Sequence, residues 1–306
     1  MSGSIAVFGS INMDLVIYSQ EKPLEGETIF GNSFQTFQGG KGANQAVAAS
    51  RLGADVSFIG KVGSDLFGKE LKRNLSNENI DISFLEEHDG ESGVAFINVF
   101  EEKSENQIIV VPGANSFVIS DQVPDDLLSL TDILISQFEV PPIQVEILFK
   151  RASKYSCFKI LNPTPFTPLS KDLVQEVDLL VVNETELERM TGHSLDGDNL
   201  DSVNSAIKEL TLLDSQALVV TLGAGGAYVQ KGKRNEYIEG MKVDAVDTTG
   251  SGDCFIGALA SKYLEQENLF ESVSFANKAA AISVTKKGTS DSMPTKDEVV
   301  NLLQTT

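Results

Sequence analysis

The feature that most constrains this chain is a series of short apolar runs separated by stretches with helical periodicity. The first run is SIAVFGSI, and later ones are ADVSFIGKV, TDILISQF, FKILNP, VDLLVVN and QALVVTLG. Such runs are typical of strands buried on both faces of a parallel sheet, and helical patterns between them indicate repeated βαβ units. The sequence therefore predicts an α/β protein with a mostly parallel central sheet.

Two further segments carry strand-like runs without helical patterns between them. Asp14 to Phe37 contains DLVIY and ETIF, and Gly93 to Val111 contains GVAFINVF and QIIVV. We interpret both segments as one small β-only insert that forms a lid over the edge of the main sheet. The alternative is that they add edge strands to that sheet. No low-complexity linker divides the chain, so we expect residues 1–306 to form a single domain.

Charge limits the ligands that such a chain can bind. Acidic residues outnumber basic ones 44 to 24, which gives a formal net charge of −20. This balance argues against nucleic acid and anionic membranes as partners. A phosphate ligand would need a local site made by a helix N-terminus, backbone N–H groups, a bound cation or one lysine. Glycine-rich turns beside helix starts are therefore the candidate sites.

Cysteine and histidine content limits metal and redox chemistry. The two cysteines, Cys157 and Cys254, form no CxxC pair, and the two histidines are His88 and His193. This argues against a disulfide framework, a thiolate zinc site and a histidine-rich metal site. No apolar run reaches about 18 residues and the start does not resemble a signal peptide, so we expect a cytoplasmic protein, also nuclear if the source is eukaryotic.

Two glycine turns match nucleotide-binding motifs only in part. GSDLFGKE, residues 63–70, nearly fits a P-loop, but Glu70 stands where that loop needs a hydroxyl for Mg²⁺. A turn that leads into a helix is the better interpretation. After the first apolar run, GSINMD contains Gly9 alone, so the GxGxxG pattern is missing and a dinucleotide-dependent dehydrogenase is disfavoured.

A third glycine turn, GGKGANQAVAASRL at residues 39–52, precedes a helix of small residues. The free N–H donors of the helix start, with Lys41 and Asn44, suit a polyhydroxylated ligand or a phosphate. Upstream, Asn12 and Asp14 follow the first strand, at the kind of strand end where open α/β sheets bind ligands. Tight helix–sheet packing explains the glycines equally well, so both interpretations stay open at this point.

Two more turns could meet a nucleotide. In VVNETELERM a strand ends at Asn183 and a helix begins with Glu184 and Glu186, which suit a helix dipole without any function. Near a phosphate, Glu186 could instead hold Mg²⁺ through water. In TLGAGGAYV, residues 221–229, a glycine-rich turn between strands would let the backbone approach adenine or ribose, although hairpins use glycine anyway.

DTTGSGD, residues 247–253, precedes CFIGALASKYL, whose apolar residues recur at helical spacing. The glycines therefore lie at a helix N-terminus, where the N–H groups of Thr249 to Gly252 would stabilise the charge of a transferred phosphoryl group. Asp253, in the first turn, has two interpretations. It is either a partner of the helix dipole or a general base that removes a hydroxyl proton.

GGKGANQAVAA, NETE, TLGAGG and DTTGSGD, in this order and at these separations, resemble the motifs of the PfkB family of carbohydrate kinases. The resemblance runs from Ser4 to Pro294, and GSINMD with GGKGANQ is most similar to the members that phosphorylate ribose. It implies a three-layer α/β/α ribokinase-like fold with a mostly parallel central sheet and a small β-sheet lid that supports a homodimer. It also implies ATP-dependent phosphorylation of D-ribose at the 5-hydroxyl, with Mg²⁺ and a monovalent cation, usually K⁺.

The resemblance further implies site residues, position by position. The sugar would be held by Asn12, Met13, Asp14, Gly40, Lys41, Gly42, Ala43, Asn44, Glu139 and Asp253. ATP would contact Asn183, Thr221, Leu222, Gly223, Ala224, Gly225, Gly226, Gly252, Asp253 and Asn277. The anion hole would be Gly250, Ser251 and Gly252, with Asp253 as the base. The monovalent cation would lie near Asp247, Thr249, Ser283, Lys286, Gly288 and Ser292, and Glu186 would hold Mg²⁺ through water. One departure is Ser251, where the family pattern usually has alanine.

Two rival functions follow from the same residues. Another kinase of the family could act on a different pentose, a ketose or a nucleoside, and the lid residues with Asn12, Asp14 and Glu139 would decide between them. A sugar- or nucleotide-binding regulator without catalysis is expected to lack Asp253 or the glycines before it. This chain keeps all of them, which favours the kinase.

Overall fold

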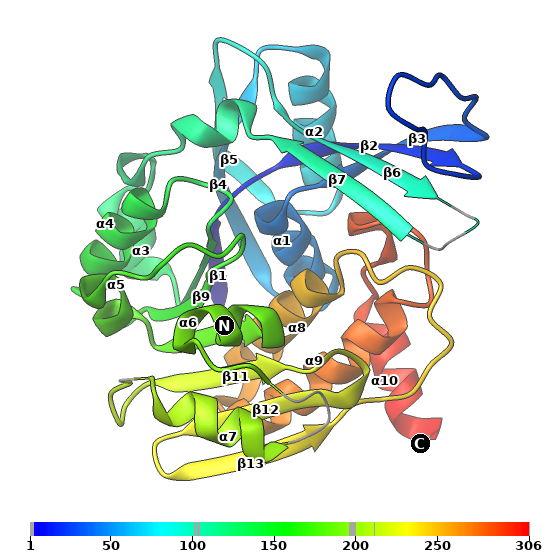
Figure 1. The fold of residues 1–306 in the computed structure, drawn as a ribbon. Helices are drawn as coiled ribbons and strands as arrows, with labels where there is room; N and C mark the ends of the chain where they lie inside the picture. The colour runs from blue at the N-terminus through cyan, green and yellow to red at the C-terminus, as the bar shows by residue number, and fades with distance from the viewer. Residues whose placement is uncertain (1–2, 101, 103–104, 196–199, 211, 306) are drawn as a thin grey trace.

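A nine-stranded sheet forms the centre of the part of the chain that the computed structural model describes, residues 3–100, 102, 105–195, 200–210 and 212–305 (Figure 1). In order across the sheet, its strands are β13 (Arg234–Glu239), β12 (Gly226–Lys231), β11 (Ala217–Thr221), β10 (Leu179–Asn183), β9 (Phe158–Asn162), β8 (Ile133–Gln137), β1 (Ser4–Phe8), β4 (Asp55–Gly63) and β5 (Asp81–His88). Neighbouring strands from β11 to β5 are parallel, whereas β12 and β13 are antiparallel additions. The predicted mostly parallel α/β sheet is confirmed.

Helices cover both faces of this sheet and complete three layers (Figure 1). One face packs against α1 (Lys41–Arg51), α2 (Leu66–Asn77), α8 (Ser251–Gln266), α9 (Leu269–Ser283) and α10 (Lys296–Thr305). The other packs against α3 (Asp125–Leu130), α4 (Pro142–Ala152), α5 (Lys171–Glu176), α6 (Glu184–Thr191) and α7 (Leu200–Lys208). Along β1, Ile5 and Val7 join the first core and Ala6 and Phe8 the second, because side chains alternate across a strand. Burial on both faces explains the continuous apolar runs.

Short 3-10 helices lie in the connections, and two of them border the site described below. They are η1 (Gly113–Phe117), η2 (Ser120–Gln122), η3 (Gly223–Gly225) and η4 (Ser290–Ser292). Among the described residues, no helix combines the length and the apolar character that crossing a membrane requires.

A separate sheet joins β3 (Ser33–Gly39), β2 (Asn12–Ser19), β6 (Gly93–Phe100) and β7 (Glu105–Val111), in that order. Its strands come from the two segments that were predicted as a β-only insert, so the alternative of extra edge strands on the main sheet is wrong. The prediction of a strand at ETIF is also wrong, because residues 27–30 lie outside regular structure and β3 begins after them. Residues 101, 103 and 104 of the predicted insert lie outside the described residues.

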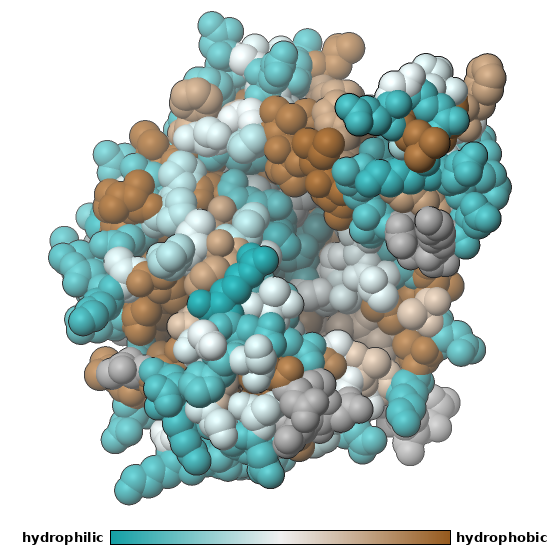
Figure 2. Space-filling model, in the orientation of Figure 1, coloured by the Kyte–Doolittle hydropathy of each residue, from teal (hydrophilic) through white to brown (hydrophobic). Residues whose placement is uncertain are grey.

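The two faces of the second sheet differ. On one face Val16, Ala95 and Ile97 are buried together. On the opposite face the cross-strand pairs Ile17–Phe34 and Phe96–Ile109 carry side chains that are 39% to 59% exposed. Figure 2 shows hydrophobic residues gathered over β7, with the surface hollowed beside them. Exposed apolar side chains in cross-strand contact are typical of a surface that a partner covers.

Candidate active site

The predicted site residues gather where several central strands end. Asn162, Asn183 and Thr221 are the last residues of β9, β10 and β11, and they line a cavity of about 130 Å³ together with Lys41 and Asp253. Two larger cavities adjoin it, about 430 Å³ beside the buried face of the second sheet and about 560 Å³ beside the turn before β12. Thr248 lines all three cavities, so they lie side by side around this residue.

The loop before α8 places a helix N-terminus at the centre of this site. Gly250 is the residue before the helix and has φ +76°, a backbone conformation that glycine adopts without strain. Ser251 and Gly252 open the helix and line both the 130 Å³ and the 560 Å³ cavities. The N–H groups of a first helical turn lack intrahelical acceptors and carry the positive end of the helix dipole. Here the N–H of Ser251 donates to the carbonyl of Thr248 over 3.3 Å. This arrangement can stabilise an anion at the junction of the two cavities.

Asp253 lies in the first turn of α8 and is 6% exposed. Its Oδ2 accepts a hydrogen bond from Nδ2 of Asn44 and its Oδ1 accepts one from Nε2 of Gln45, each over 3.0 Å. Burial raises the pKa of the Asp253 carboxyl, and the charge of Lys41 and the two amide donors oppose that rise. A carboxylate whose pKa is raised within an anion site can act as a general base.

Lys41 is the first residue of α1 and lines the 130 Å³ cavity. Burial disfavours its ammonium charge, but the carboxylates of Asp253 and Glu139 outweigh that effect and raise the pKa of Lys41. The side chain therefore stays protonated at neutral pH. In a chain with a net charge of −20, it supplies the local positive charge that a phosphate needs.

Among the described residues, one predicted sugar ligand borders the cavity beside the second sheet. Asp14 lines it, and burial together with the charges of Glu139 and Asp253 raises the pKa of Asp14 from 3.8 to about 7. The amide of Asn12 is oriented by Asn115, whose Nδ2 donates to Asn12 Oδ1 over 2.7 Å. Oε2 of Glu139 accepts from Ser10 Oγ over 2.6 Å and from the backbone N–H of Lys41 over 3.0 Å.

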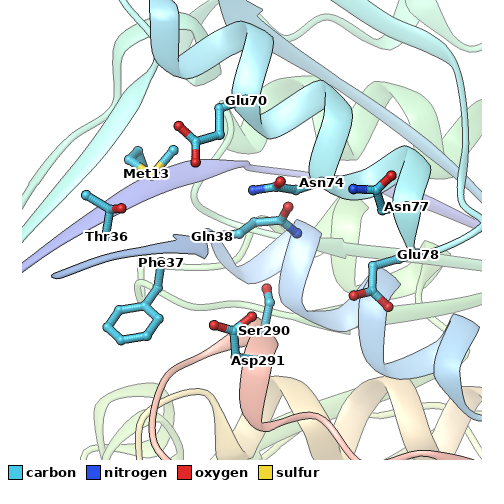
Figure 3. A pocket seen from close by; sticks show the side chains of 10 residues that line it. All are labelled: Met13, Thr36, Phe37, Gln38, Glu70, Asn74, Asn77, Glu78, Ser290 and Asp291. Carbon is cyan, nitrogen blue, oxygen red and sulfur yellow. The ribbon is translucent and has the colours of Figure 1, made fainter.

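Other predicted sugar ligands take different positions. Side chains alternate along β2, so Met13 points away from the side chain of Asp14 and lines a cavity of about 200 Å³ between α2 and β3 (Figure 3). Ala43 is fully buried, and its N–H donates to the carbonyl of Ser10. Gly40 and Gly42 approach the chain after β1 so closely that a Cβ on either would lie 2.7 Å from its backbone. Their role in holding α1 against that loop is therefore steric.

The 560 Å³ cavity suits the flat base of a nucleotide. Small and apolar residues line most of it, which lets a planar ring approach the backbone. The predicted residues Thr221, Gly223, Ala224, Gly226 and Asn277 line this cavity, whereas the predicted residue Gly225 does not. Leu222 instead packs against the hydrophobic core, and Asn277 Nδ2 donates to the carbonyls of Ile238 and Glu239. Asn183 lies in the neighbouring 130 Å³ cavity.

The predicted cation ligands come together in part. Asp247 Oδ1 accepts from the N–H of Thr249 over 3.0 Å, and Oδ2 accepts from the N–H of Gly288 over 3.1 Å. The N–H of Asp247 donates to the carbonyl of Val284, which brings the chain after α9 alongside. The carbonyl of Ser283 accepts from the N–H of Lys286, while the Lys286 ammonium is paired with Glu298 at the surface. Ser292 is buried, and its Oγ donates to the carbonyl of Thr289.

Glu186 forms a capping box at the start of α6. Its Oε2 accepts from the N–H of Asn183 over 2.9 Å, while Asn183 Oδ1 accepts from the N–H of Glu186 over 2.9 Å. The hydroxyl of Thr164 donates to Oε1. The carboxylate also lines the 130 Å³ cavity, so it combines a structural contact with access to the site. Among the described residues, no group of three or more His, Cys, Asp or Glu side chains is arranged to hold a metal ion.

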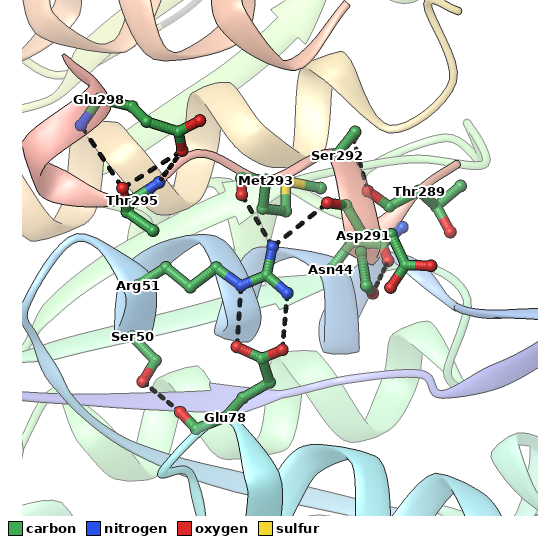
Figure 4. A network of polar contacts seen from close by, with 11 residues as sticks. Asn44, Ser50, Arg51, Glu78, Thr289, Asp291, Ser292, Met293, Thr295 and Glu298 are labelled. Carbon is green, nitrogen blue, oxygen red and sulfur yellow. Dashed lines mark hydrogen bonds and ion pairs between the residues drawn. The ribbon is translucent and has the colours of Figure 1, made fainter. Parts of the chain in front are cut away.

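Behind the site, Arg51 fixes the chain around η4 (Figure 4). Its guanidinium donates to both carboxylate oxygens of Glu78 and to the carbonyl oxygens of Asp291 and Met293. This network holds Ser290 where its Oγ donates to Asn44 Oδ1 over 2.7 Å. Arg51 therefore holds η4 in place, and Ser290 of η4 contacts Asp253 through Asn44.

Sequence reasoning did not single out several residues that contact the site. They are Gln45, Asn115, Gln137, Thr164, Thr248, Thr289 and Ser290. Gln45 and Thr248 stand inside the motifs GGKGANQ and DTTGSGD, so position in a motif could have indicated them. Thr289 and Ser290 stand between the predicted cation ligands Gly288 and Ser292, which could likewise have indicated them. Asn115, Gln137 and Thr164 come from other parts of the sequence, and no local pattern marks them.

Comparisons with known proteins agree with this geometry. A family model described as pfkB family carbohydrate kinase matches residues 2–296. A ribokinase from Haemophilus influenzae is 39% identical over 311 residues, which cover 99% of both chains. A deoxyribokinase from Salmonella typhi is 35% identical over 301 residues, which cover 96% of both. The solved structure of Arabidopsis thaliana ribokinase complexed with ribose and ATP superposes with a TM-score of 0.89 at 30% identity and covers 99% of both chains.

Proposed function

The chain belongs to the pfkB family of carbohydrate kinases, and we propose on this premise that it phosphorylates the 5-hydroxyl of D-ribose with ATP, giving ribose 5-phosphate and ADP. The observation that carries the proposal is the place of Asp253. Asp253 is buried in the first turn of α8 and lines the 130 Å³ cavity, which shares Thr248 with the cavity lined by Asp14 and with the cavity beside the β12 turn.

The residues around this carboxylate divide the reaction between them. Asp253 accepts the proton of the hydroxyl, whose oxygen attacks the γ-phosphorus while the bond to the β,γ-bridging oxygen breaks and ADP leaves. The backbone N–H groups of Gly250, Ser251 and Gly252 stabilise the charge of the transferred phosphoryl group. Lys41 adds a fixed positive charge in the same cavity. Asn12, Asp14, Asn44 and Glu139 orient the sugar.

Mg²⁺ and a monovalent cation complete the proposed site. Mg²⁺ supplies charge neutralisation on the phosphates, and the carboxylate of Glu186 in the 130 Å³ cavity is placed to hold it through water. K⁺ would lie at Asp247, Thr249, Ser283, Lys286, Gly288 and Ser292, where backbone oxygens and one carboxylate suit a weakly hydrated cation. Its effect there would be to set the geometry of the loop that carries the anion hole.

We also propose that two copies of the chain associate through the second sheet and that this sheet acts as a lid over the sugar. The exposed pairs Ile17–Phe34 and Phe96–Ile109 support the first part, because they give an apolar surface that a second copy would bury. The 430 Å³ cavity on the opposite face supports the second. A cytoplasmic location and a single domain stay predictions.

The test is ADP release measured over a panel of acceptors with K⁺ and Na⁺ compared. The panel holds D-ribose, 2-deoxyribose, other pentoses, fructose and a nucleoside, and 2-deoxyribose is included because one relative is a deoxyribokinase. Ribose should give the highest kcat/KM, with a higher rate in K⁺ than in Na⁺. A signal with another acceptor and none with ribose would overturn the substrate while leaving the kinase activity standing.

A further inference from the structure

The two amides that hold Asp253 are each held in turn by another donor. Ser290 Oγ donates to Oδ1 of Asn44 over 2.7 Å, and Nε2 of Gln137 donates to Oε1 of Gln45 over 2.6 Å. Two chains of hydrogen bonds therefore run toward the carboxylate, one from η4 and one from the end of β8. In both chains every donor points in the direction of Asp253.

This direction has a physical consequence for the amides. The two ends of a carboxamide have nearly the same shape, so Gln45 could rotate and turn its oxygen toward the carboxylate. An oxygen in that position would repel the charged form of Asp253. Nε2 of Gln137 opposes the rotation, because a rotated Gln45 would set one N–H donor against another.

Gln137 keeps this position although one of its own atoms is left without a partner. The side chain is fully buried, and its Oε1 has no hydrogen-bond partner among the described residues. An unpartnered buried acceptor lowers the stability of a fold, and such atoms are therefore rare away from functional sites. Gly9 leaves the space for this oxygen, since a Cβ there would lie 2.3 Å from it.

We infer that Gln137 is a positioning residue that fixes the proton acceptor Asp253 through Gln45, and that Ser290 does the same through Asn44. The inference rests on the proposed role of Asp253 as the base. Hydrogen bonds to both oxygens restrain the carboxylate from turning, and Asp253 also lines the 130 Å³ cavity. Gln137 lines none of the three cavities, and its side chain reaches Asp253 through Gln45.

The hydrogen bonds from Gln137 to Gln45 and from Gln45 to Asp253 form a relay. Removal of this relay should also change the pH dependence of the reaction. The charged groups that act on Asp253 are Lys41 from α1, Glu139 after β8 and Asp14 from β2. The amide of Gln45 stabilises the ionised form beside them, so loss of its donor raises the pKa of Asp253 further. The acid limb of the pH profile of kcat then moves to higher pH.

The experiment uses Gln137→Met, Gln45→Met and the double variant, each assayed from about pH 5.5 to 9. Gln137→Met should lower kcat roughly 10-fold, the effect of a lost hydrogen bond near a charge, with the acid limb shifted upward and the KM for ATP unchanged. The double variant should be no slower than Gln45→Met, because the two residues act in series. The inference would be overturned if the two losses in kcat multiplied in the double variant, or if Gln137→Met kept the wild-type pH profile.

A second variant keeps the test decisive if Gln137→Met folds poorly. In Gln137→Glu, the protonated carboxyl donates to Gln45 as the amide does, whereas the ionised form accepts and turns Gln45 around. Its activity should approach wild type at low pH and fall as pH rises, a trend that packing alone does not produce. Folding is followed across the same range by circular dichroism. Loss of activity without that pH trend counts against the relay.

The matched control is Gln216→Met, which removes another buried amide whose Nε2 donates to the carbonyls of Val174 and Val177. It should lose stability and keep kcat. Asp253→Asn separates this inference from the proposed function. If Asp253→Asn turns over normally, the base itself is wrong. If it is inactive while the Gln137 variants match wild type, the relay alone is wrong.

Discussion

Gly288 donates its backbone N–H to Oδ2 of Asp247 over 3.1 Å and so joins the loop before α8 to the loop after α9. The other carboxylate oxygen of Asp247 accepts from Thr249, two residues before Ser251 opens the helix. One side chain therefore couples the anion hole to the segment in which the cation is proposed to bind.

Asp247→Ala should abolish activation by K⁺. The variant loses both the tie to Gly288 and the charge that attracts the ion, so its rate should fall toward the K⁺-free rate of the wild type. The measurement is kcat against K⁺ concentration at constant ionic strength, with Asp244→Ala, an exposed carboxylate on the same loop, as control. Equal K⁺ sensitivity in Asp247→Ala and wild type would remove the cation from this position.

Asp253→Asn should lower kcat by roughly 10² to 10⁴, which is about 3 to 5 kcal/mol of barrier, because the amide cannot take the hydroxyl proton. ATP affinity, measured by calorimetry without sugar, should change little, since the N–H groups of the helix start remain. Near-wild-type turnover would take the base role away from Asp253.

Asp14→Asn should stabilise the sugar-free protein at alkaline pH while it destroys sugar binding. The pKa of Asp14 is about 7 in the folded state, against an ordinary value of 3.8 that represents the unfolded chain. The protonated carboxyl therefore contributes its full stability to the folded protein below about pH 4, and this contribution is lost as the pH rises through 7. At about pH 8 the variant should gain on the order of 2 kcal/mol, and at about pH 4 it should gain nothing. Denaturant unfolding at both pH values measures this, and an equal change at both would contradict it.

Glu186→Gln should raise the Mg²⁺ concentration needed for half-maximal activity by roughly 10-fold, since a carboxylate is lost from a water-mediated site. The free energy of unfolding should change by less than about 1 kcal/mol, because the new amide oxygen can still accept from the N–H of Asn183. Glu184→Gln, in the same helical turn, is the control. An unchanged Mg²⁺ requirement would leave Glu186 with its structural role alone.

Phe96→Asp should convert a dimer into a monomer. The side chain is 41% exposed in the middle of the apolar face of the second sheet, where a buried charge would oppose association. Sedimentation velocity gives the mass, and Leu130→Asp, at an exposed apolar position at the end of α3, controls for added charge. A wild-type monomer would end the proposal outright.

The central sheet was readable from the sequence because its strands are buried on both faces, as in ILISQ of β8 and LLVVN of β10. Edge strands were not. β5 (DISFLEEH) mixes exposed and buried positions and β13 (RNEYIE) is almost wholly exposed, so the pairing partner decides their structure more than their composition does. The prediction of a strand at ETIF is wrong for a related reason, because residues with high β-propensity do not form a strand where no neighbouring strand pairs with them.

The site was readable only where its residues stand in motifs. Asp253, Lys41 and Asn44 lie beside glycines whose backbone geometry can be inferred locally. Gln137 and Ser290 act on that site across 92 and 246 positions of sequence, through contacts that exist only after folding. The roles of the motif residues stay predictions until the variants above are measured.

The 430 Å³ and 560 Å³ cavities are lined by largely different parts of the sequence. Within the described parts of the chain, the residues that line the 560 Å³ cavity all come from Thr221 onward. The 430 Å³ cavity, in contrast, is lined partly by residues of the second sheet, namely Asp14, Val16, Tyr18, Phe37, Ile97 and Val99. Acceptor range and nucleotide affinity can therefore diverge separately under selection. A directed-evolution library confined to residues 12–37 and 93–111 would explore new acceptors while leaving the donor side of the enzyme unaltered.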